Sequence, residues 1–194
     1  MKNKIHLILI LLSISLISLN AQTQKIKKIP KSIEAFVEMR NDIATTPEGG
    51  AAMFMLALKM YTENPELAKK CFVAIVDRNL LREGNVYKGY QLLNSDMSLI
   101  KNQLAKDQNI PNAYIKGATP ENHYKVKLPY VFEFTSNKYS GSIEKGDFKL
   151  FVACSGADSP RPIRMKKNNR GIWKTSNWNS VLVGIKKPPI DDDL

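Results

Sequence analysis

The spacing of apolar residues changes near Pro111, and this change limits what the chain can fold into. Before Pro111, apolar residues recur every three or four positions, as they do on one face of a helix. After it they alternate every second position, most clearly from Tyr124 to Phe134. Helices followed by antiparallel strands indicate an α+β domain, in which about four N-terminal helices pack on a curved C-terminal antiparallel sheet.

Capping residues predict where the helices begin. Ser32, Thr46 and Asn64 are good N-caps, and the last two are each followed by Pro and Glu, which favour the first helical turn. The expected helices span 32–43, 46–63, 64–84 and 96–106. Residues 51–58 are apolar all round, which predicts that the second helix is central and buried.

Alternation and turn residues predict the strands. In the segment 124–134, Pro129 cannot donate to two neighbours, so we expect an edge strand or a bulge there. Further strands are expected at 148–154, 161–166, 171–175 and 180–185. The two asparagines at 168 and 169 predict the tip of a hairpin.

The first 21 residues have the pattern of a secretory signal peptide. Lys2 and Lys4 precede an apolar run that ends before Ala21, after which we expect cleavage. The run has about 15 residues, short of the roughly 20 that a spanning helix needs, so no transmembrane segment is expected in the mature chain. Gln22, and not a cysteine, directly follows the predicted cut, so we expect no lipid anchor. The sequence therefore predicts a periplasmic or extracellular protein.

The remaining chain is long enough for one domain with a hydrophobic core. Lysines and Pro30 dominate the segment after the predicted cleavage site, which therefore resembles a mobile leader. The expected organisation is a signal peptide at 1–21, a mobile leader at 22–31, a single α+β domain at 32–187 and an acidic tail at 188–194.

The distribution of basic residues is typical of a solvated surface rather than of a nucleic-acid binder. The chain has 29 Lys and Arg against 18 Asp and Glu, a net charge of +11. The lysines are dispersed and arginines are few, whereas a nucleic-acid binder concentrates arginines and aromatics on one stripe. We therefore expect no nucleic acid, and the open alternatives for a partner are an anionic envelope component or another protein.

The two cysteines, Cys71 and Cys154, lie inside apolar runs. Free cysteine behaves as a small buried hydrophobe, so we expect two buried free thiols. A disulfide is the alternative, because disulfides persist outside the cytoplasm.

Catalytic and metal-binding signatures are absent from the sequence pattern. After the predicted cleavage site the only histidine is His123, with no cluster of further ligands around it. No nucleophile motif or phosphate-binding glycine loop is present, so we expect no metal and no cofactor. Gly49 and Gly50 open a helix, where small residues serve close packing or, alternatively, present N–H groups to an anion.

The segment 155–164 is the candidate binding loop. It leaves a strand and combines glycine, aspartate and arginines with two prolines, which stiffen it. The candidate binding residues are Asp158, Arg161, Arg164, Trp173 and Trp178. The structural alternative is that Asp158 caps the turn and pairs with Arg161, while the tryptophans pack against the helices.

Three C-terminal motifs carry a resemblance. The segments SGADSPRPI at 155–163, GIWK at 171–174 and SVLVGI at 180–185 resemble the end of a family of exported bacterial proteins known only as a domain of unknown function. The resemblance implies an envelope or secreted setting and one α+β domain, and it implies no catalytic residues. The element order is also similar to nuclear-transport-factor-2-like domains, which implies a pocket between helices and sheet.

The expected function is a non-catalytic binding or interaction module of the bacterial cell envelope, with an unidentified ligand. Two alternatives stay open. One is a small envelope enzyme that uses a pocket between helices and sheet, with His123, Asp158 and Arg161 as its candidate groups. The other is a structural or inhibitor protein that buries the loop against a partner.

Overall fold

A computed structural model describes residues 21–190 of the chain. The expected signal peptide, apart from Ala21, and the last four residues of the expected acidic tail lie outside the described residues. Within the described part, none of the helices is both long and apolar enough to cross a membrane.

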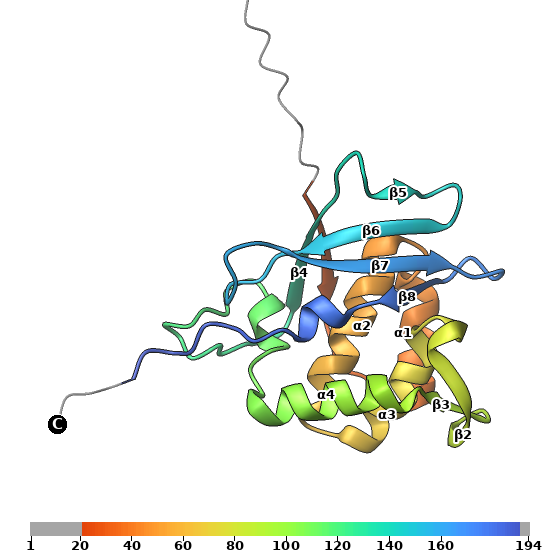
Figure 1. Ribbon diagram of the computed structural model, residues 1–194, viewed down its shortest axis with the longest axis horizontal. Helices are drawn as coiled ribbons and strands as arrows, with labels where there is room; N and C mark the ends of the chain where they lie inside the picture. The colour runs from red at the N-terminus through yellow and green to blue at the C-terminus, as the bar shows by residue number, and fades with distance from the viewer. Residues whose placement is uncertain (1–20, 191–194) are drawn as a thin grey trace, which may run out of the picture.

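The fold is α+β, with the helices mostly in the N-terminal half and an antiparallel sheet formed mostly by the C-terminal half (Figure 1). The helices are α1 (Ile33–Ile43), α2 (Pro47–Tyr61), α3 (Pro65–Ile75) and α4 (Asn94–Lys106), with short 3-10 turns η1 (Arg78–Leu80), η2 (Asn112–Tyr114) and η3 (Asn179–Leu182). The sheet strands are β1 (Gln22–Ile26), β4 (Tyr130–Thr135), β5 (Gly141–Ser142), β6 (Asp147–Val152), β7 (Arg161–Lys167) and β8 (Trp173–Asn177). Their order is β1-β4-β6-β7-β8, with β5 paired to β6, and a separate hairpin joins β2 (Leu81–Tyr87) to β3 (Tyr90–Leu92).

The three predicted helix starts are confirmed. The Ser32 hydroxyl accepts a hydrogen bond from the Ala35 N–H at 3.2 Å. The side chains of Thr46 and Asn64 accept likewise from backbone N–H groups three residues on, each at 3.1 Å. Each cap satisfies one N–H that the first turn leaves without a partner.

Helix α2 forms the centre of the core, as its apolar sequence predicts. Every residue from Pro47 to Leu58 is buried, and Phe54 packs against Phe72 and Trp178 at ring-centroid distances of 5.9 and 5.2 Å. A Cβ on Gly50 would lie 2.5 Å from the backbone oxygen of Trp173 on β8. The structure therefore supports close packing as the reason for glycine at the start of this helix.

The expected third helix, 64–84, is longer than helix α3 of the structure. Helix α3 ends at Ile75, because Val76 is extended and forms a parallel bridge with Thr175 on β8. The Asp77 N–H donates to the Thr175 carbonyl oxygen at 2.8 Å. This contact with a distant strand stops the helix, and the β2–β3 hairpin follows where the sequence analysis expected helix up to Gly84.

The mobile-leader prediction is wrong for residues 22–26. These residues form β1, which pairs antiparallel with β4, and Ile26 is only 1% exposed. Strand β4 is therefore an interior strand between β1 and β6, so the edge-strand expectation at Pro129 is also wrong. Pro129 instead lies just before β4 begins, where it needs no ladder hydrogen bond.

Two predicted strand segments take other conformations. His123 and Tyr124 have φ angles of 55° and 53°, so the alternating residues 124–129 lie in a turn and coil and only Tyr130 onward is strand. The segment expected as a strand at 180–185 begins in η3, and the buried Tyr114 hydroxyl donates to the Val181 oxygen at 2.8 Å.

Other predictions are confirmed. The β7–β8 hairpin turns at Asn168, whose side-chain oxygen accepts from the N–H groups of Arg170 and Ile172, both at 2.9 Å. Strand β6 covers most of the expected 148–154 segment. Cys71 and Cys154 are both buried and free, so the disulfide alternative is wrong.

Candidate functional site

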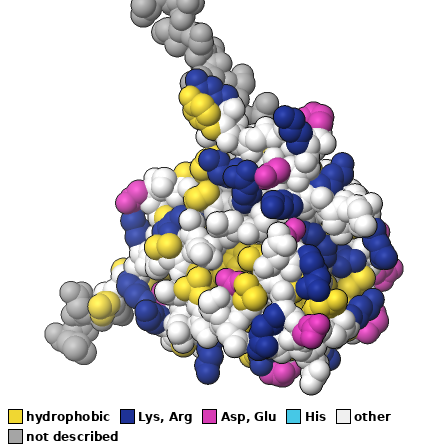
Figure 2. Space-filling view, turned by 45° about the vertical axis from the view of Figure 1, so that its right-hand side comes forward, with side chains coloured by type: hydrophobic (Ala, Val, Ile, Leu, Met, Phe, Trp, Pro, Cys, Tyr) yellow, Lys and Arg dark blue, Asp and Glu magenta, His cyan; other side chains and the backbone are white. Residues whose placement is uncertain are grey.

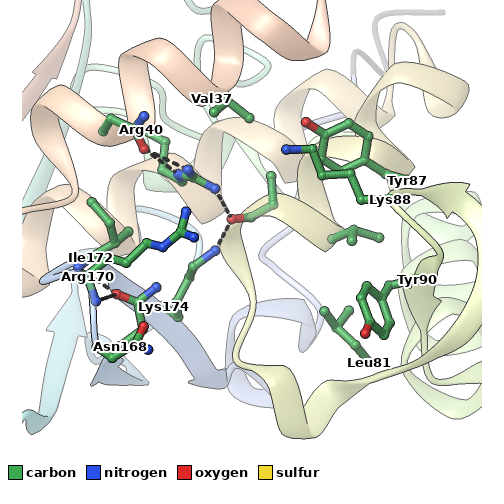
Figure 3. A pocket seen from close by; sticks show the side chains of 14 residues that line it. Val37, Arg40, Leu81, Tyr87, Lys88, Tyr90, Asn168, Arg170, Ile172 and Lys174 are labelled. Atoms are coloured by element: carbon green, nitrogen blue, oxygen red, sulfur yellow. Dashed lines mark hydrogen bonds between the residues drawn. The ribbon is translucent and has the colours of Figure 1, made fainter.

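A pocket of about 600 Å³ lies where helix α1, the end of α3, the β2–β3 hairpin and the β7–β8 turn meet (Figure 3). We call it the basic–aromatic pocket, defined by Arg40, Arg170 and Lys174 on one wall and by Leu81, Tyr87, Lys88 and Tyr90 on the other. On the face shown in Figure 2, lysines and arginines are dispersed rather than gathered in one stripe. The grouping of cations in this pocket is therefore a local feature.

The end of helix α3 positions two of the cations. The Arg40 Nη1 group donates to the Ala74 carbonyl oxygen at 2.9 Å, and the Lys174 ammonium donates to the same oxygen (Figure 3). Arg40 also donates through Nε and Nη2 to the Asn41 side-chain oxygen. Helix α3 has no basic residue in its own last turn, so these two residues supply the positive charge that favours a helix C-terminus.

The pocket holds these charges in a weakly solvated place. Burial, reinforced by the positive charge of Arg40, lowers the pKa of Lys174 to about 7, and Asp77 opposes this only in part. Burial also lowers the pKa of Arg40, and the neighbouring Arg170 adds to that effect. No Asp or Glu side chain lines the pocket in the described part of the chain. Its wall is therefore short of counter-charge.

The β2–β3 hairpin provides the aromatic wall. Lys88 and Gly89, with φ angles of 49° and 80°, form the turn that brings Tyr87 opposite Tyr90. The guanidinium of Arg78 stacks on Tyr90 at 3.9 Å from the ring centroid. Tyr87 and Tyr90 are both only partly buried, so each presents ring surface to the pocket.

In the predicted binding loop, Arg161 and Asp158 do not pair with each other. Arg161 Nη1 and Nη2 donate to the carbonyl oxygens of Ser180 and Gly184 at 3.2 and 3.1 Å. Asp158, whose side chain is 90% exposed, forms an ion pair with Lys186 at 2.7 Å, which lowers its pKa. Both residues line an open depression of about 580 Å³, in which Arg161 connects β7 to η3 and to the segment after it.

The other three candidates lie elsewhere. Arg164 forms a two-pronged ion pair with Asp147 at the surface, at 2.7 and 2.9 Å, and its hydrogen bonds lower the pKa of that carboxyl. Trp173 and Trp178 are each 1% exposed and belong to the core, so the expectation that they line a binding site is wrong. Their large apolar rings fill the space between sheet and helix α2.

The structure gives no support to His123, Asp158 and Arg161 as a catalytic cluster. His123 is exposed in a turn, and Arg161 bonds backbone oxygens. Within residues 21–190, no group of three or more His, Cys, Asp or Glu side chains is placed to hold a metal ion.

Sequence reasoning missed the residues of the basic–aromatic pocket. Arg40 lies on a helix, Lys88 in the turn of a hairpin that the sequence did not predict, and Lys174 on a strand. No local motif links them, because their proximity depends on how α3 meets β8. The only related signal was the asparagine turn that carries Arg170.

Searches of curated proteins and of solved structures found no match to this chain. The family profile described as Domain of unknown function (DUF6935) matches residues 28–189, which include all four α-helices and every strand except β1. Since this match covers most of the chain and the whole of the basic–aromatic pocket, the protein belongs to the DUF6935 family.

Proposed function

We propose that the protein is a non-catalytic binding module whose ligand occupies the basic–aromatic pocket. One observation carries the proposal: an open pocket of about 600 Å³ has hydrogen-bond donors on one wall and tyrosine rings on the other. Small-molecule sites are concave, with apolar and aromatic linings and a few convergent polar groups. The pocket has this composition.

The pocket chemistry favours binding over catalysis. Its lining within the described residues contains no carboxylate, imidazole or thiol, the groups that most often act as acids, bases or nucleophiles. Arg40 and Arg170 stay charged and can hold and orient a ligand without taking part in proton transfer. Lys174, with its pKa of about 7, is the one basic group of this wall that can gain or lose a proton near neutral pH.

The setting we propose is the bacterial cell envelope. The support is the signal-peptide pattern at 1–21, with Lys2 and Lys4 before an apolar run that ends at Ala21. The proposal also includes the nuclear-transport-factor-2-like arrangement, and its support is that residues of α1, α3 and β8 line the basic–aromatic pocket together. A ligand there would contact helices and sheet together.

The test is a ligand screen by ¹⁵N–¹H NMR on purified protein, with a panel of neutral and charged small molecules and envelope glycans. We expect at least one compound to shift amide signals of Arg40, Tyr87 and Arg170. Val37→Trp, which fills the pocket from α1, should abolish these shifts. The matched control is Tyr139→Trp at an exposed position, which should leave them unchanged. Shifts that persist in Val37→Trp would contradict the proposed site.

A further inference from the structure

We infer that the basic–aromatic pocket binds an anionic ring compound: Arg40, Arg170 and Lys174 hold its phosphate or carboxylate group, and Tyr87 contacts its ring. The inference rests on the proposed function and specifies the ligand of the same site. It is drawn from the arrangement of charges on one wall and of rings on the other (Figure 3).

The basic wall contains more positive charge than the fold needs there. Arg40 and Lys174 share the Ala74 carbonyl oxygen, which carries only the partial negative charge of a helix end. In Figure 3 the Arg170 side chain reaches toward the same wall, and its charge contributes to the lowered pKa of Arg40. Like charges held close together repel, and an anion between them would remove that repulsion.

A purely structural role accounts for only two of the three cations. Arg40 and Lys174 stabilise the C-terminus of α3. Arg170 has no such role: its side chain is exposed, and among residues 21–190 its guanidinium forms no hydrogen bond and no ion pair. Only its backbone N–H is engaged, in the turn with Asn168. Its side chain is free to close over an anion, and a guanidinium matches the geometry of carboxylate and phosphate.

The lowered pKa of Lys174 predicts how the binding of an anion should depend on pH. Burial is the main cause of the lowered pKa of Lys174, Arg40 on α1 adds to it, and Asp77 at the start of η1 opposes it. Because the pKa of Lys174 is about 7, a large fraction of the free protein has a neutral amine above that pH. A bound anion would raise this pKa, so binding above pH 7 should take up a proton and weaken as the pH rises.

The opposite wall favours a ring on the ligand. Arg78 lies over one face of the Tyr90 ring at 3.9 Å from its centroid, and Lys88 lies over one face of the Tyr87 ring at the longer distance of 5.5 Å. Tyr87 therefore has ring surface left for a flat or cyclic group, with a hydroxyl that can bond to its polar edge. An anionic saccharide combines a ring with a phosphate or a carboxylate.

Isothermal titration calorimetry on purified protein tests the inference with four small probes: glucose 6-phosphate, glucuronate, glucose and inorganic phosphate. We expect one of the two anionic sugars to bind at least tenfold more tightly than glucose and than inorganic phosphate. Titrations at pH 8 in buffers of different ionisation enthalpy should reveal proton uptake. A titration with polygalacturonate distinguishes the two sources of such a ligand, a polysaccharide of the envelope and a free metabolite. Tighter binding of the polymer than of glucuronate identifies the polysaccharide, and tighter binding of glucuronate identifies the metabolite.

The variants are Arg170→Gln and Lys174→Gln, with Lys145→Gln on the β5–β6 turn as a control that loses the same charge elsewhere. Arg170→Gln should weaken binding at least tenfold, Lys174→Gln should also abolish the proton uptake, and the control should do neither. Equal binding of glucose and the anionic sugars, or an unchanged Arg170→Gln, would overturn the inference. If only a neutral compound binds, and Val37→Trp abolishes that binding, the inference is overturned while the proposed function stands. If inorganic phosphate binds as tightly as glucose 6-phosphate, the ring contact is overturned.

Discussion

Replacing Arg161 with alanine tests whether the segment 155–164 is held by structure or is free to bind. Arg161 joins the start of β7 to η3 and to the segment after it, through hydrogen bonds to the Ser180 and Gly184 oxygens at 3.2 and 3.1 Å. The first of these bonds is partly buried and the second is exposed. A hydrogen bond from a charged group contributes about 1.5–3 kcal/mol, and exposure reduces that value. We therefore expect Arg161→Ala to lower the free energy of unfolding by about 1.5–3 kcal/mol in total.

Arg164→Ala is the matched control on the same strand. Arg164 also donates two hydrogen bonds, but to the carboxylate of Asp147 at the surface, where the Arg164 side chain is 50% exposed. Exposed ion pairs contribute about 0.2–1 kcal/mol, so this variant should be the less destabilised of the two. Arg161→Lys keeps the charge and loses the fork that reaches two oxygens, and we expect it to fall between wild type and Arg161→Ala.

Urea unfolding followed by tryptophan fluorescence measures these differences, because Trp173 and Trp178 are buried in the folded protein. The reasoning predicts a larger loss for Arg161→Ala than for Arg164→Ala, with equal slopes of free energy against urea. If Arg161→Ala is no less stable than Arg164→Ala, the loop is not held by Arg161. The original interpretation of this segment as a binding loop would then regain support.

Four further outcomes are expected. Gly50→Ala should lower the free energy of unfolding by about 1–3 kcal/mol in urea unfolding despite the better helix propensity of alanine, because its Cβ meets the backbone of β8 at 2.5 Å; unchanged stability would contradict the packing argument. Cys71 and Cys154 should resist maleimide in the native protein and both react in urea without reductant, since both are buried and burial raises the pKa of Cys71 to about 12; labelling only after reduction would show a disulfide. The pKa of Lys174 is about 7 in the folded protein and 10.5 for an ordinary lysine, so between these two pH values the unfolded chain binds more protons than the folded protein. The free energy of unfolding of wild type relative to Lys174→Met, measured by urea titration, should therefore rise from pH 7 to pH 10.5. A stability difference that does not change with pH would refute the lowered pKa. Protein from the native host should begin at Gln22 by intact mass, and a mass that includes residues 1–21 would defeat the signal-peptide prediction.

Local chemistry made several elements predictable from the sequence. The caps at Ser32, Thr46 and Asn64 depend on a side chain that reaches a backbone N–H three residues on. The turn at Asn168 depends on contacts within four residues, and the buried helix α2 shows its environment in its own composition. The α+β class followed from the same short-range spacings.

Elements whose boundaries depend on distant partners were not predictable in this way. The segment 22–26 has the composition of a leader, and it becomes β1 only because β4 offers an unpaired edge more than a hundred residues later in the chain. Helix α3 ends where Thr175 captures the backbone of Val76 and Asp77. The propensities of these residues are weak compared with such pairings.

The candidate site was decided by tertiary structure alone. The sequence pointed to Arg161 and the tryptophans, because prolines and aromatics stand out in a chain read residue by residue. The folded protein uses those groups for packing and for a tie between segments, and it gathers Arg40, Arg170 and Lys174 around the end of α3 instead. Sequence determines which side chains can carry charge, but the distance between charges from different elements arises only when helix and sheet pack together.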